Sequence, residues 1–397
     1  MKIAYIGKIS LSALAGCGRW ERQTASGGWI TAEGSLSRQK WGFSLGSMII
    51  GGLLKRGHEV HVVSAEPEDV CGRFRCHVNG ENRCRLTVTF VPESPKTRWM
   101  YLRFFWREMA GMRRTIREVK PDVCFAQWTY ENAYAGLTSG YPTLVVAHDS
   151  PWNVFKAFRN LQTLIKAVYA TFLVVPKIKR MTVVSPYIAD EFKNFRRFRH
   201  SDITVIPNGI EMLRDEREGM RDEIGGMRQN IPSPIPHPPT IVSISQAGRL
   251  KNSQALFKAW DILKPKHPDW RLLVYGQGMP QGMVSREELD RVLREEADLF
   301  VSPSLEESFG MVFVEAMRFG VPCIGGEKSG AVPWVICEGG VVCDVTKPEK
   351  LAECIEQVMG DKELRKKLGD RGRQSVRGMF DIEKVVDMYE MELVKTK

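Results

Sequence analysis

The sequence has no long hydrophobic run: none of its 397 residues lies in a stretch of about 18 consecutive apolar residues, so no membrane-spanning helix is expected. It also lacks a Cys-x-x-Cys pair, although it contains nine cysteines. An odd number of scattered cysteines does not fit a disulfide framework and indicates a reducing compartment. Because Met1–Gly7 begins as a strand-like run without a signal-peptide pattern, we expect a cytoplasmic protein.

Residue types that bind metals cluster at Cys71, Cys76, His77 and Cys84. A zinc site is one interpretation of this cluster. Structural zinc sites favour a closely spaced pair of cysteines, however, and that pair is missing here. We therefore predict free thiols in a variable loop and no metal site.

Acidic residues are scarce in the first half of the chain. Residues 1–207 contain 30 lysines and arginines against 16 aspartates and glutamates, whereas residues 208–397 contain 27 against 31. The basic half is therefore expected to meet an anionic partner. No nucleic-acid-binding module is recognisable in the sequence, so nucleic acid is not predicted to be that partner.

Short apolar runs typical of β-strands alternate with helical patterns along the whole chain. This alternation is typical of parallel sheets with helices on both faces. We therefore predict an α/β fold of two doubly wound, Rossmann-like domains facing across a cleft, where ligands would bind. The expected strands are Lys2–Ile6, Glu59–Val63, Val123–Ala126, Thr143–Ala147, Met181–Val184, Ile203–Ile206, Thr240–Ser245, Arg271–Tyr275, Leu299–Val301, Val321–Ile324 and Gly340–Cys343.

A charged, proline-rich stretch separates the two halves. Residues 1–207 are predicted to form an N-terminal domain and residues 240–380 a C-terminal domain. Residues 208–239 are predicted to be a linker or surface excursion, because a run so rich in proline cannot be one regular element. The amphipathic pattern of Ile382–Val394 predicts a final helix within residues 381–397.

The segment Ser302–Met317 places two carboxylates around the start of one predicted helix. The apolar run Leu299–Val301 precedes it, and Gly310 supplies a tight turn before the helical pattern. Glu307 is then expected in the loop above the helix N-terminus and Glu315 on the helix itself. Ionised carboxylates accept hydrogen bonds from hydroxyl-rich ligands such as sugars, and a helix N-terminus suits a phosphate.

Glu307 and Glu315, with Phe309-Gly310 between them, resemble the E-x7-E signature of retaining glycosyltransferases with the GT-B fold, family 4 (glycosyltransferase group 1). The resemblance implies transfer of a sugar from a nucleotide-sugar donor to an acceptor, with retention at the anomeric carbon and without a metal or other cofactor. Further segments that are similar to the family, in the family's order, are Lys120–Val123, Trp128–Tyr130, Val145–Asp149, Thr182–Ser185, Val205–Ile210, Tyr275–Gly278, Ser285–Leu289 and Ala297-Asp298.

The resemblance assigns the donor to the C-terminal domain. It implies that Lys251 contacts the diphosphate, where a cation stabilises the negative charge of the leaving group. Glu307 would bind hydroxyls of the donor sugar and Glu315 those of the ribose. The turns that would complete the donor site contain Phe309, Gly310, Met311 and Gly276.

The resemblance assigns the acceptor, a glycan or a lipid-linked glycan, to the N-terminal domain. It implies that His148 faces the donor sugar from a strand end and that Asp149 is an orienting or acceptor-side group. Gly27-Gly28, in an expanded loop after the first strand, is a candidate for the family's glycine-containing loop near the diphosphate, and a plain surface loop is the alternative. The final helix is expected to pack back on the N-terminal domain.

Two departures from the family pattern concern donor binding. Five residues before the lysine the family has an arginine, but this chain has Gln246, and the nearest arginine is Arg249. Either Arg249 reaches the phosphates or one cation is missing. The family also places a helix and a strand between Gly278 and Ser285, where this chain has six residues. We therefore predict a shortened donor domain with an altered nucleotide-base pocket.

Aromatic and basic residues are interleaved in residues 98–117. One interpretation is a helix that lies on an anionic membrane surface, which would place the protein at the inner face of the membrane beside a lipid-linked acceptor. The alternative is that the aromatic side chains pack on the sheet while the arginines face water.

Three functions fit these observations. The first is a glycosyltransferase of surface polysaccharide or lipopolysaccharide-type biosynthesis. The second is a non-catalytic relative that binds a nucleotide-sugar, which Gln246 and the shortened domain favour. The third is a sugar-nucleotide 2-epimerase, which shares the two-domain architecture but is not expected to carry the signature of Glu307 and Glu315.

Overall fold

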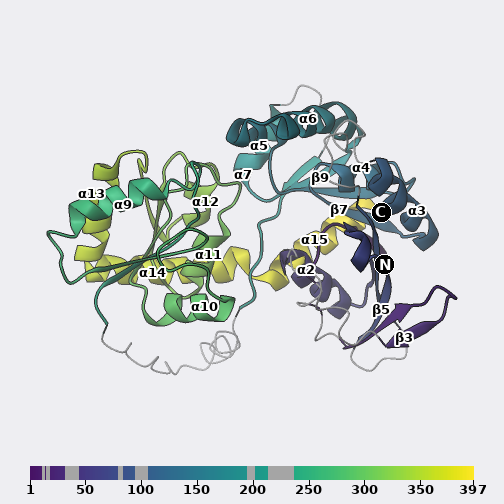
Figure 1. The fold of residues 1–397 in the computed structure, drawn as a ribbon, viewed down its shortest axis with the longest axis horizontal. Helices are drawn as coiled ribbons and strands as arrows, with labels where there is room; N and C mark the ends of the chain where they lie inside the picture. The colour runs from purple at the N-terminus through teal and green to yellow at the C-terminus, as the bar shows by residue number, and fades with distance from the viewer. Residues whose placement is uncertain are drawn as a thin grey trace. The chain divides into compact units, whose positions relative to one another are not determined.

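A computed structural model describes residues 1–10, 14, 18–31, 44–78, 84–93, 106–194, 202–212 and 237–397. The chain divides into two compact units. Unit 1 consists of Met1–Gly209 together with Ile382–Lys397, and unit 2 of Ile210–Asp381. Each unit has a sheet with helices packed against it (Figure 1). The α/β class is therefore confirmed, and the division lies close to the boundary predicted near residue 207.

Unit 1 contains a ten-stranded sheet in its described residues, in the order β10-β9-β8-β7-β1-β4-β6-β5-β2-β3. The strands from β10 to β6 are parallel, and β5, β2 and β3 add an antiparallel edge. Their bounds are β1 Lys2–Ile6, β2 Gly18–Gln23, β3 Trp29–Thr31, β4 Glu59–Glu66, β5 Gly72–Val78, β6 Leu86–Pro92, β7 Val123–Gln127, β8 Thr143–Ala147, β9 Arg180–Val183 and β10 Asp202–Val205.

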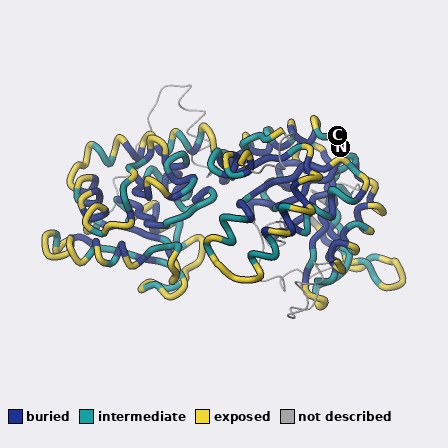
Figure 2. Tube along the Cα trace, turned by 90° about the horizontal axis from the view of Figure 1, so that it is seen from above, coloured by how far each residue is buried: buried dark blue, intermediate teal, exposed yellow. Residues whose placement is uncertain are grey.

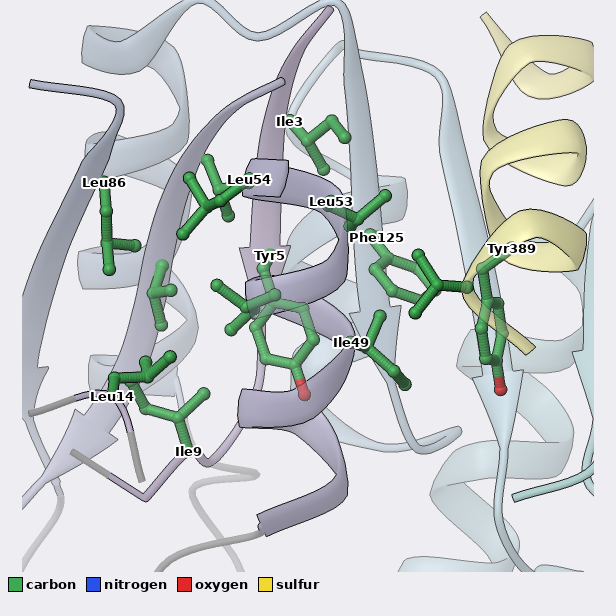
Figure 3. Close-up of a cluster of buried hydrophobic side chains, with 14 of the residues drawn as sticks. Ile3, Tyr5, Ile9, Leu14, Ile49, Leu53, Leu54, Leu86, Phe125 and Tyr389 are labelled. Atoms are coloured by element: carbon green, nitrogen blue, oxygen red, sulfur yellow. The ribbon is translucent and has the colours of Figure 1, made fainter. Parts of the chain in front are cut away.

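Helices cover both faces of this sheet, and one of them comes from the end of the chain. The helix α15 contributes Val385, Tyr389 and Leu393 to the same buried cluster as Ile3 and the strands around it. Figure 3 shows Tyr389 beside Phe125 of β7, with ring centroids 5.1 Å apart. The α-helices of unit 1 are α2 Ser44–Lys55, α3 Trp106–Val119, α4 Glu131–Leu137, α5 Pro151–Phe158, α6 Leu161–Tyr169, α7 Pro186–Lys193 and α15 Ile382–Thr396.

Unit 2 contains a five-stranded parallel sheet in its described residues, in the order β12-β11-β13-β14-β15. The strands β11, β13 and β14 are mainly buried, whereas the edge strands β12 and β15 are only partly buried, and exposed positions lie mainly outside the strands (Figure 2). The elements are β11 Thr240–Ile244, α9 Ser253–Leu263, β12 Arg271–Tyr275, α10 Arg286–Glu295, β13 Leu299–Val301, α11 Met311–Arg318, β14 Cys323–Gly326, α12 Val332–Ile336, β15 Gly340–Cys343, α13 Pro348–Gly360 and α14 Lys362–Ser375.

The connection between β12 and β13 has a single helix, α10, as the shortened spacing after Gly278 predicts. In the strand order 3-2-1-4-5-6 of many doubly wound sheets, another strand would lie outside β12. Here β12 is an edge strand among the described residues. The side chain of Gln281 covers part of this edge, since its Oε1 accepts from the backbone N–H of Val274 at 2.6 Å.

Candidate active site

The order of the unit 2 sheet identifies where a ligand is expected. The chain goes from β11 to β12 on one side and then crosses to β13 on the other side, so the strand order reverses between β11 and β13. Doubly wound sheets bind ligands beyond the carboxyl ends of the strands at such a point. Lys251 follows β11 and Glu307 follows β13, so both predicted residues lie at the reversal.

Lys251 and Glu307 form an ion pair, with Nζ 2.5 Å from Oε1. Both side chains are partly buried, with 31% of Lys251 and 15% of Glu307 exposed. The two loops are tied together by the backbone N–H of Leu305, which donates to the carbonyl of Leu250 at 2.8 Å. The carbonyl of Glu307 in turn accepts from Ala331 N–H at 2.9 Å. The backbone therefore fixes a cation and a carboxylate side by side at this edge.

Gly310 and Phe309 shape the turn into α11. Gly310 has φ 95°, in the left-handed region that favours glycine, and a Cβ there would lie 2.9 Å from Cδ2 of Phe313. The Phe309 side chain is 3% exposed and packs edge-to-face on Trp334 and Phe380. This side chain anchors the turn, so what Phe309 and Met311 can offer a ligand is their backbone N–H groups.

Glu315 has a partner that the sequence reasoning missed. Arg286, the first residue of α10, donates from Nη1 to Oε1 of Glu315 at 2.6 Å, and its Nε lies 3.1 Å from Oδ1 of Asp290. The only available signal was the position of Arg286 in the family-like segment Ser285–Leu289, 29 residues before Glu315. Arg286 therefore places a second cation beside Glu315.

The glycine turn after β12 lies against the loop after β11. Gly276 has φ 132°, and a Cβ there would lie only 1.7 Å from the carbonyl oxygen of Ser245. Gln246 follows Ser245, and both Gln246 and Arg249 are exposed in the turn that leads to Lys251. The turn at Gly276 therefore lies against the start of the loop that contains Gln246, Arg249 and Lys251.

In unit 1 the strand order reverses between β1 and β7. His148 follows β8, the next strand along, and its Nε2 lies 2.8 Å from Oε1 of Gln127, the last residue of β7. The Trp128 ring is 4.9 Å from the imidazole, centroid to centroid. Burial lowers the pKa of His148 to about 3, so the imidazole is neutral at physiological pH.

Asp149 belongs to a second hydrogen-bonded group beside His148. The hydroxyl of Tyr130 donates to Oδ1 of Asp149 at 3.1 Å, and the Lys166 ammonium lies 5.3 Å from the centre of the Tyr130 ring. Burial raises the pKa of Asp149 to about 6, against the opposing effects of the Tyr130 hydrogen bond and the Lys166 charge. Tyr130, after β7, and Asp149, after β8, therefore form a hydrogen-bonded pair that contains a titratable carboxyl.

Gly27-Gly28 lies in an exposed hairpin turn, as the alternative of a plain surface loop predicts. The two glycines are exposed in the turn of the β2–β3 hairpin, where Gly27 N–H donates to the Thr24 carbonyl at 3.0 Å. Three strands separate β2 from β1 in the sheet. Gly27 has φ 88°, so the turn geometry accounts for this glycine.

The remaining predictions concern metals and membranes. Among the described residues, no group of three or more potential metal ligands comes together. Cys76 lies in β5, and the Cys84 thiol donates to its carbonyl at 3.2 Å.

Residues 98–105 of the basic aromatic stretch lie outside the described residues, whereas α3 covers the rest. The described helices are too short or too polar to span a bilayer.

Two family profiles match the chain. Glycosyltransferase Family 4 matches residues 48–214, and Glycosyl transferases group 1 matches residues 229–375. The chain is also 43% identical over 96 residues to the N-acetyl-alpha-D-glucosaminyl L-malate synthase of Bacillus anthracis, and 32% identical over 102 residues to the lipopolysaccharide core biosynthesis glycosyltransferase LpsE of Rhizobium meliloti. These matches span 24% and 25% of this chain, and 25% and 29% of the relatives' lengths.

The fold matches solved structures over nearly the whole chain. One of them is HepE of Anabaena in complex with UDP and glucose, with a TM-score of 0.61, 15% sequence identity and 99% of each chain covered. At this level of identity the likeness concerns the fold. Together with the two family profiles, it shows that the chain belongs to the group 1 glycosyltransferases, family 4, with the GT-B fold.

Proposed function

We propose that this transferase moves a sugar from a nucleotide-sugar donor to a hydroxyl of a glycan or glycolipid, with retention at the anomeric carbon and without a metal. The observation that carries the proposal is the ion pair of Lys251 and Glu307 at the strand-order reversal of unit 2. A nucleotide-sugar needs a cation beside its diphosphate and a hydrogen-bond acceptor beside its sugar hydroxyls. Lys251 and Glu307 supply the two groups.

The proposed chemistry needs charge stabilisation more than covalent catalysis. As the glycosidic bond breaks, the anomeric carbon becomes oxocarbenium-like and the diphosphate gains negative charge. Lys251 would stabilise the diphosphate. Arg286 is a second cation, and it pairs with Glu315, the residue proposed to bind the ribose. The N–H groups of Phe309 and Met311 would add donors at the start of α11. These cations support a metal-independent reaction.

A thermal-shift screen followed by a transfer assay tests the proposal. Because HepE was solved with UDP, uridine nucleotides and UDP-sugars are the first donors to screen. Ligand at 100 times its dissociation constant adds about 2.7 kcal/mol to the free energy of unfolding. We expect one nucleotide family to raise the melting temperature, and the product anomer, read by NMR, to match that of the donor. An inverted product would overturn retention, and loss of activity in EDTA would overturn metal independence.

A second candidate is a non-catalytic relative that binds a nucleotide-sugar. The observations that favour it are the exposed Gln246 at the arginine position and the single-helix connection from β12 to β13. This candidate predicts a thermal shift with a nucleotide but no transfer or hydrolysis with any acceptor. Turnover of a bound donor would exclude it.

We propose surface polysaccharide or lipopolysaccharide-type assembly as the setting, because one relative is a lipopolysaccharide core glycosyltransferase. This setting places the acceptor at a membrane, and α3 offers a basic surface for an anionic one. Its inner side buries Met109, Met112 and Ile116, whereas Trp106 is 51% exposed. A surface cavity of about 540 Å³ on this helix is lined by Ala110, Arg113, Arg114, Arg117 and Glu118.

Flotation with vesicles tests the membrane proposal. We expect binding to vesicles that contain anionic lipid and none to neutral vesicles at low salt, because arginines beside an exposed tryptophan suit an anionic interface. The triple variant of Arg113, Arg114 and Arg117 to Gln should lose this binding. A matched control removes three positive charges from α14, at Lys362, Lys366 and Lys367, and should keep it. Equal loss in both variants would show that only net charge matters.

A further inference from the structure

Gln127 is a buried polar residue at the strand-order reversal of unit 1 that neither the sequence reasoning nor the proposed mechanism uses. It is 0% exposed, and its Oε1 lies 2.8 Å from Nε2 of His148. Its amide nitrogen, Nε2, is also buried and has no hydrogen-bond partner in the described part of the structure. Burying an amide that is only half satisfied is unfavourable, so packing alone does not explain a glutamine here.

The backbone around Gln127 is arranged to keep this side chain in place. Gly7 follows β1, and a Cβ at this position would lie 2.8 Å from Cγ of Gln127. Any larger residue at position 7 would therefore push the amide away from His148. On the other side, Trp128 has φ 63° and packs its ring 4.9 Å from the imidazole, which limits rotation of the ring.

A neutral imidazole carries its proton on one nitrogen, and the hydrogen bond at that nitrogen decides which. We propose that Gln127 is a positioning residue that holds His148 in the neutral tautomer with the proton on Nε2. In this arrangement Nε2–H donates to Oε1 of Gln127, and Nδ1 is the acceptor nitrogen. The consequence for transfer rests on the proposed function: a neutral imidazole can accept a hydrogen bond from a sugar hydroxyl, which an imidazolium cannot do.

The charged groups near His148 are engaged with one another. The carboxyl of Asp149 is engaged by the Tyr130 hydroxyl, and Lys166 lies over the Tyr130 ring. Glu131, the residue after Tyr130, is the first residue of α4. Burial lowers the pKa of His148 far below neutral. The ring should therefore stay in the same neutral tautomer between pH 6 and 8.

NMR of the histidine rings tests the proposal without any substrate. The chain has seven histidines, and His148→Gln identifies the ring signals of His148 by their loss. In the ¹⁵N-labelled wild type we expect a protonated Nε2 and an unprotonated Nδ1 that do not change over neutral pH. Gln127→Leu should give a mixture of tautomers. The matched control is Thr129→Val, an isosteric change at a buried residue two positions on, which should leave the His148 signals as they are.

A proton on Nδ1 in the wild type, or an unchanged His148 spectrum in Gln127→Leu, would overturn the proposal. If Gln127→Leu does not fold, the isosteric Gln127→Glu provides the same test. A carboxylate opposite Nε2–H stabilises the imidazolium, so the ring of His148 should then begin to titrate near neutral pH. A ring that stays neutral in this variant would also overturn the proposal.

An activity measurement separates positioning from a structural role. With a donor identified, Gln127→Glu should lower kcat about tenfold, and this loss should grow as the pH falls while the donor KM changes less. A loss that does not depend on pH would indicate a structural role and overturn the positioning role. If no donor is ever turned over, the proposed function fails, but the NMR result on the tautomer still stands or falls by itself.

Discussion

At the residue scale, the ion pair of Lys251 and Glu307 makes the sharpest prediction about function. Glu307→Gln keeps the shape of the side chain but removes the charge that pairs with Lys251 and that would bind sugar hydroxyls under the proposed function. We expect sugar transfer to fall about 100-fold or more, as when a preorganised polar group is removed from an active site. The free energy of unfolding should change by less than about 1 kcal/mol, because the pair is partly exposed.

Glu306→Gln is the matched control for this experiment, since Glu306 is the neighbouring carboxylate in the same loop. Steady-state rates of both variants and their urea unfolding curves give the comparison. Equal activity losses in the two variants would show that loop charge in general matters and that Glu307 has no particular role.

Asp149 predicts a pH-dependent stability. Burial raises its pKa in the folded protein to about 6, above the ordinary value of 3.8 in the unfolded chain. The folded state therefore holds this proton more tightly, so the free energy of unfolding contributed by Asp149 falls as pH rises from about 4 to about 6 and is constant above that. Over this range the contribution falls by up to about 3 kcal/mol.

The measurement is urea unfolding of the wild type and Asp149→Asn at several pH values from 4 to 8, chosen to bracket the folded-state pKa of about 6. Other groups titrate in this range, so the difference between the two proteins is what matters. The free energy of unfolding of Asp149→Asn, relative to that of the wild type, should increase as pH rises through this range. A difference that is flat with pH would show that the carboxyl of Asp149 is not perturbed by burial.

The sequence located the residues of the candidate site better than their partners. Lys251 and Glu307 were predictable because each follows a short apolar strand, and the ends of neighbouring parallel strands meet at one edge. The pairing of Arg286 with Glu315 was not predictable from the sequence. It depends on how α10 lies against α11, and the two residues are 29 positions apart in the chain. Gln127 was missed because a glutamine at the end of a strand resembles an ordinary solvated residue.

At the element scale, two neighbouring glycines of α2 report on the docking of α15. A Cβ at Gly52 would lie 2.7 Å from Cγ2 of Val386 in α15, whereas a Cβ at Gly51 would have no atom within 4 Å. Gly51→Ala should raise the free energy of unfolding by about 1 kcal/mol, because alanine favours a helix. Gly52→Ala has the same intrinsic gain but should lower the free energy by 1 kcal/mol or more, roughly the cost of overpacking a core.

Chemical denaturation of the two single variants is the measurement. The pair shares one helix and one chemical change, so the difference between the variants isolates the contact with Val386. Two variants of equal stability would show that α15 does not pack tightly against α2 in solution.

The strands show what periodicity can and cannot find. All eleven expected strands are present, with ends shifted by up to three residues. The segment β14 begins two residues later than expected and continues through Gly325 and Gly326, where a Cβ at Gly325 would lie 2.5 Å from Val332. The antiparallel edge of β2, β3 and β5 was missed because charged residues alternate along it, as Arg73 and Arg75 do, and its strands are only partly buried. β6 was overlooked despite its run of Val, Thr and Phe.

At the scale of the whole molecule, the uneven charge predicts salt-dependent membrane binding. Residues 1–207 have 30 basic against 16 acidic residues, whereas the remainder is slightly acidic. If the basic part binds anionic vesicles, the attraction should be screened within about 10 Å at 0.1 M salt and within about 3 Å at 1 M. We expect bound protein to fall at least tenfold between these salt concentrations, measured by co-sedimentation.

Binding that survives 1 M salt would point to insertion of apolar side chains such as Trp106 instead of electrostatic attraction. Trp106→Ala then distinguishes the two, because it should weaken insertion and leave an electrostatic contact nearly unchanged. Neutral vesicles at low salt serve as the control for both experiments.

The placement of α15 has a consequence for how the protein is made. Unit 1 begins at Met1, but its buried cluster of Ile3, Tyr5 and Phe125 also includes Val385 and Tyr389, which are translated after all of unit 2. At ribosomal rates of 5–20 residues per second, this helix emerges roughly 10–40 s after Gly209. During that interval nascent unit 1 exposes the apolar surface that α15 later covers. The unit made first is therefore completed last, and chaperones that bind exposed hydrophobic segments would meet it while unit 2 is still being synthesised.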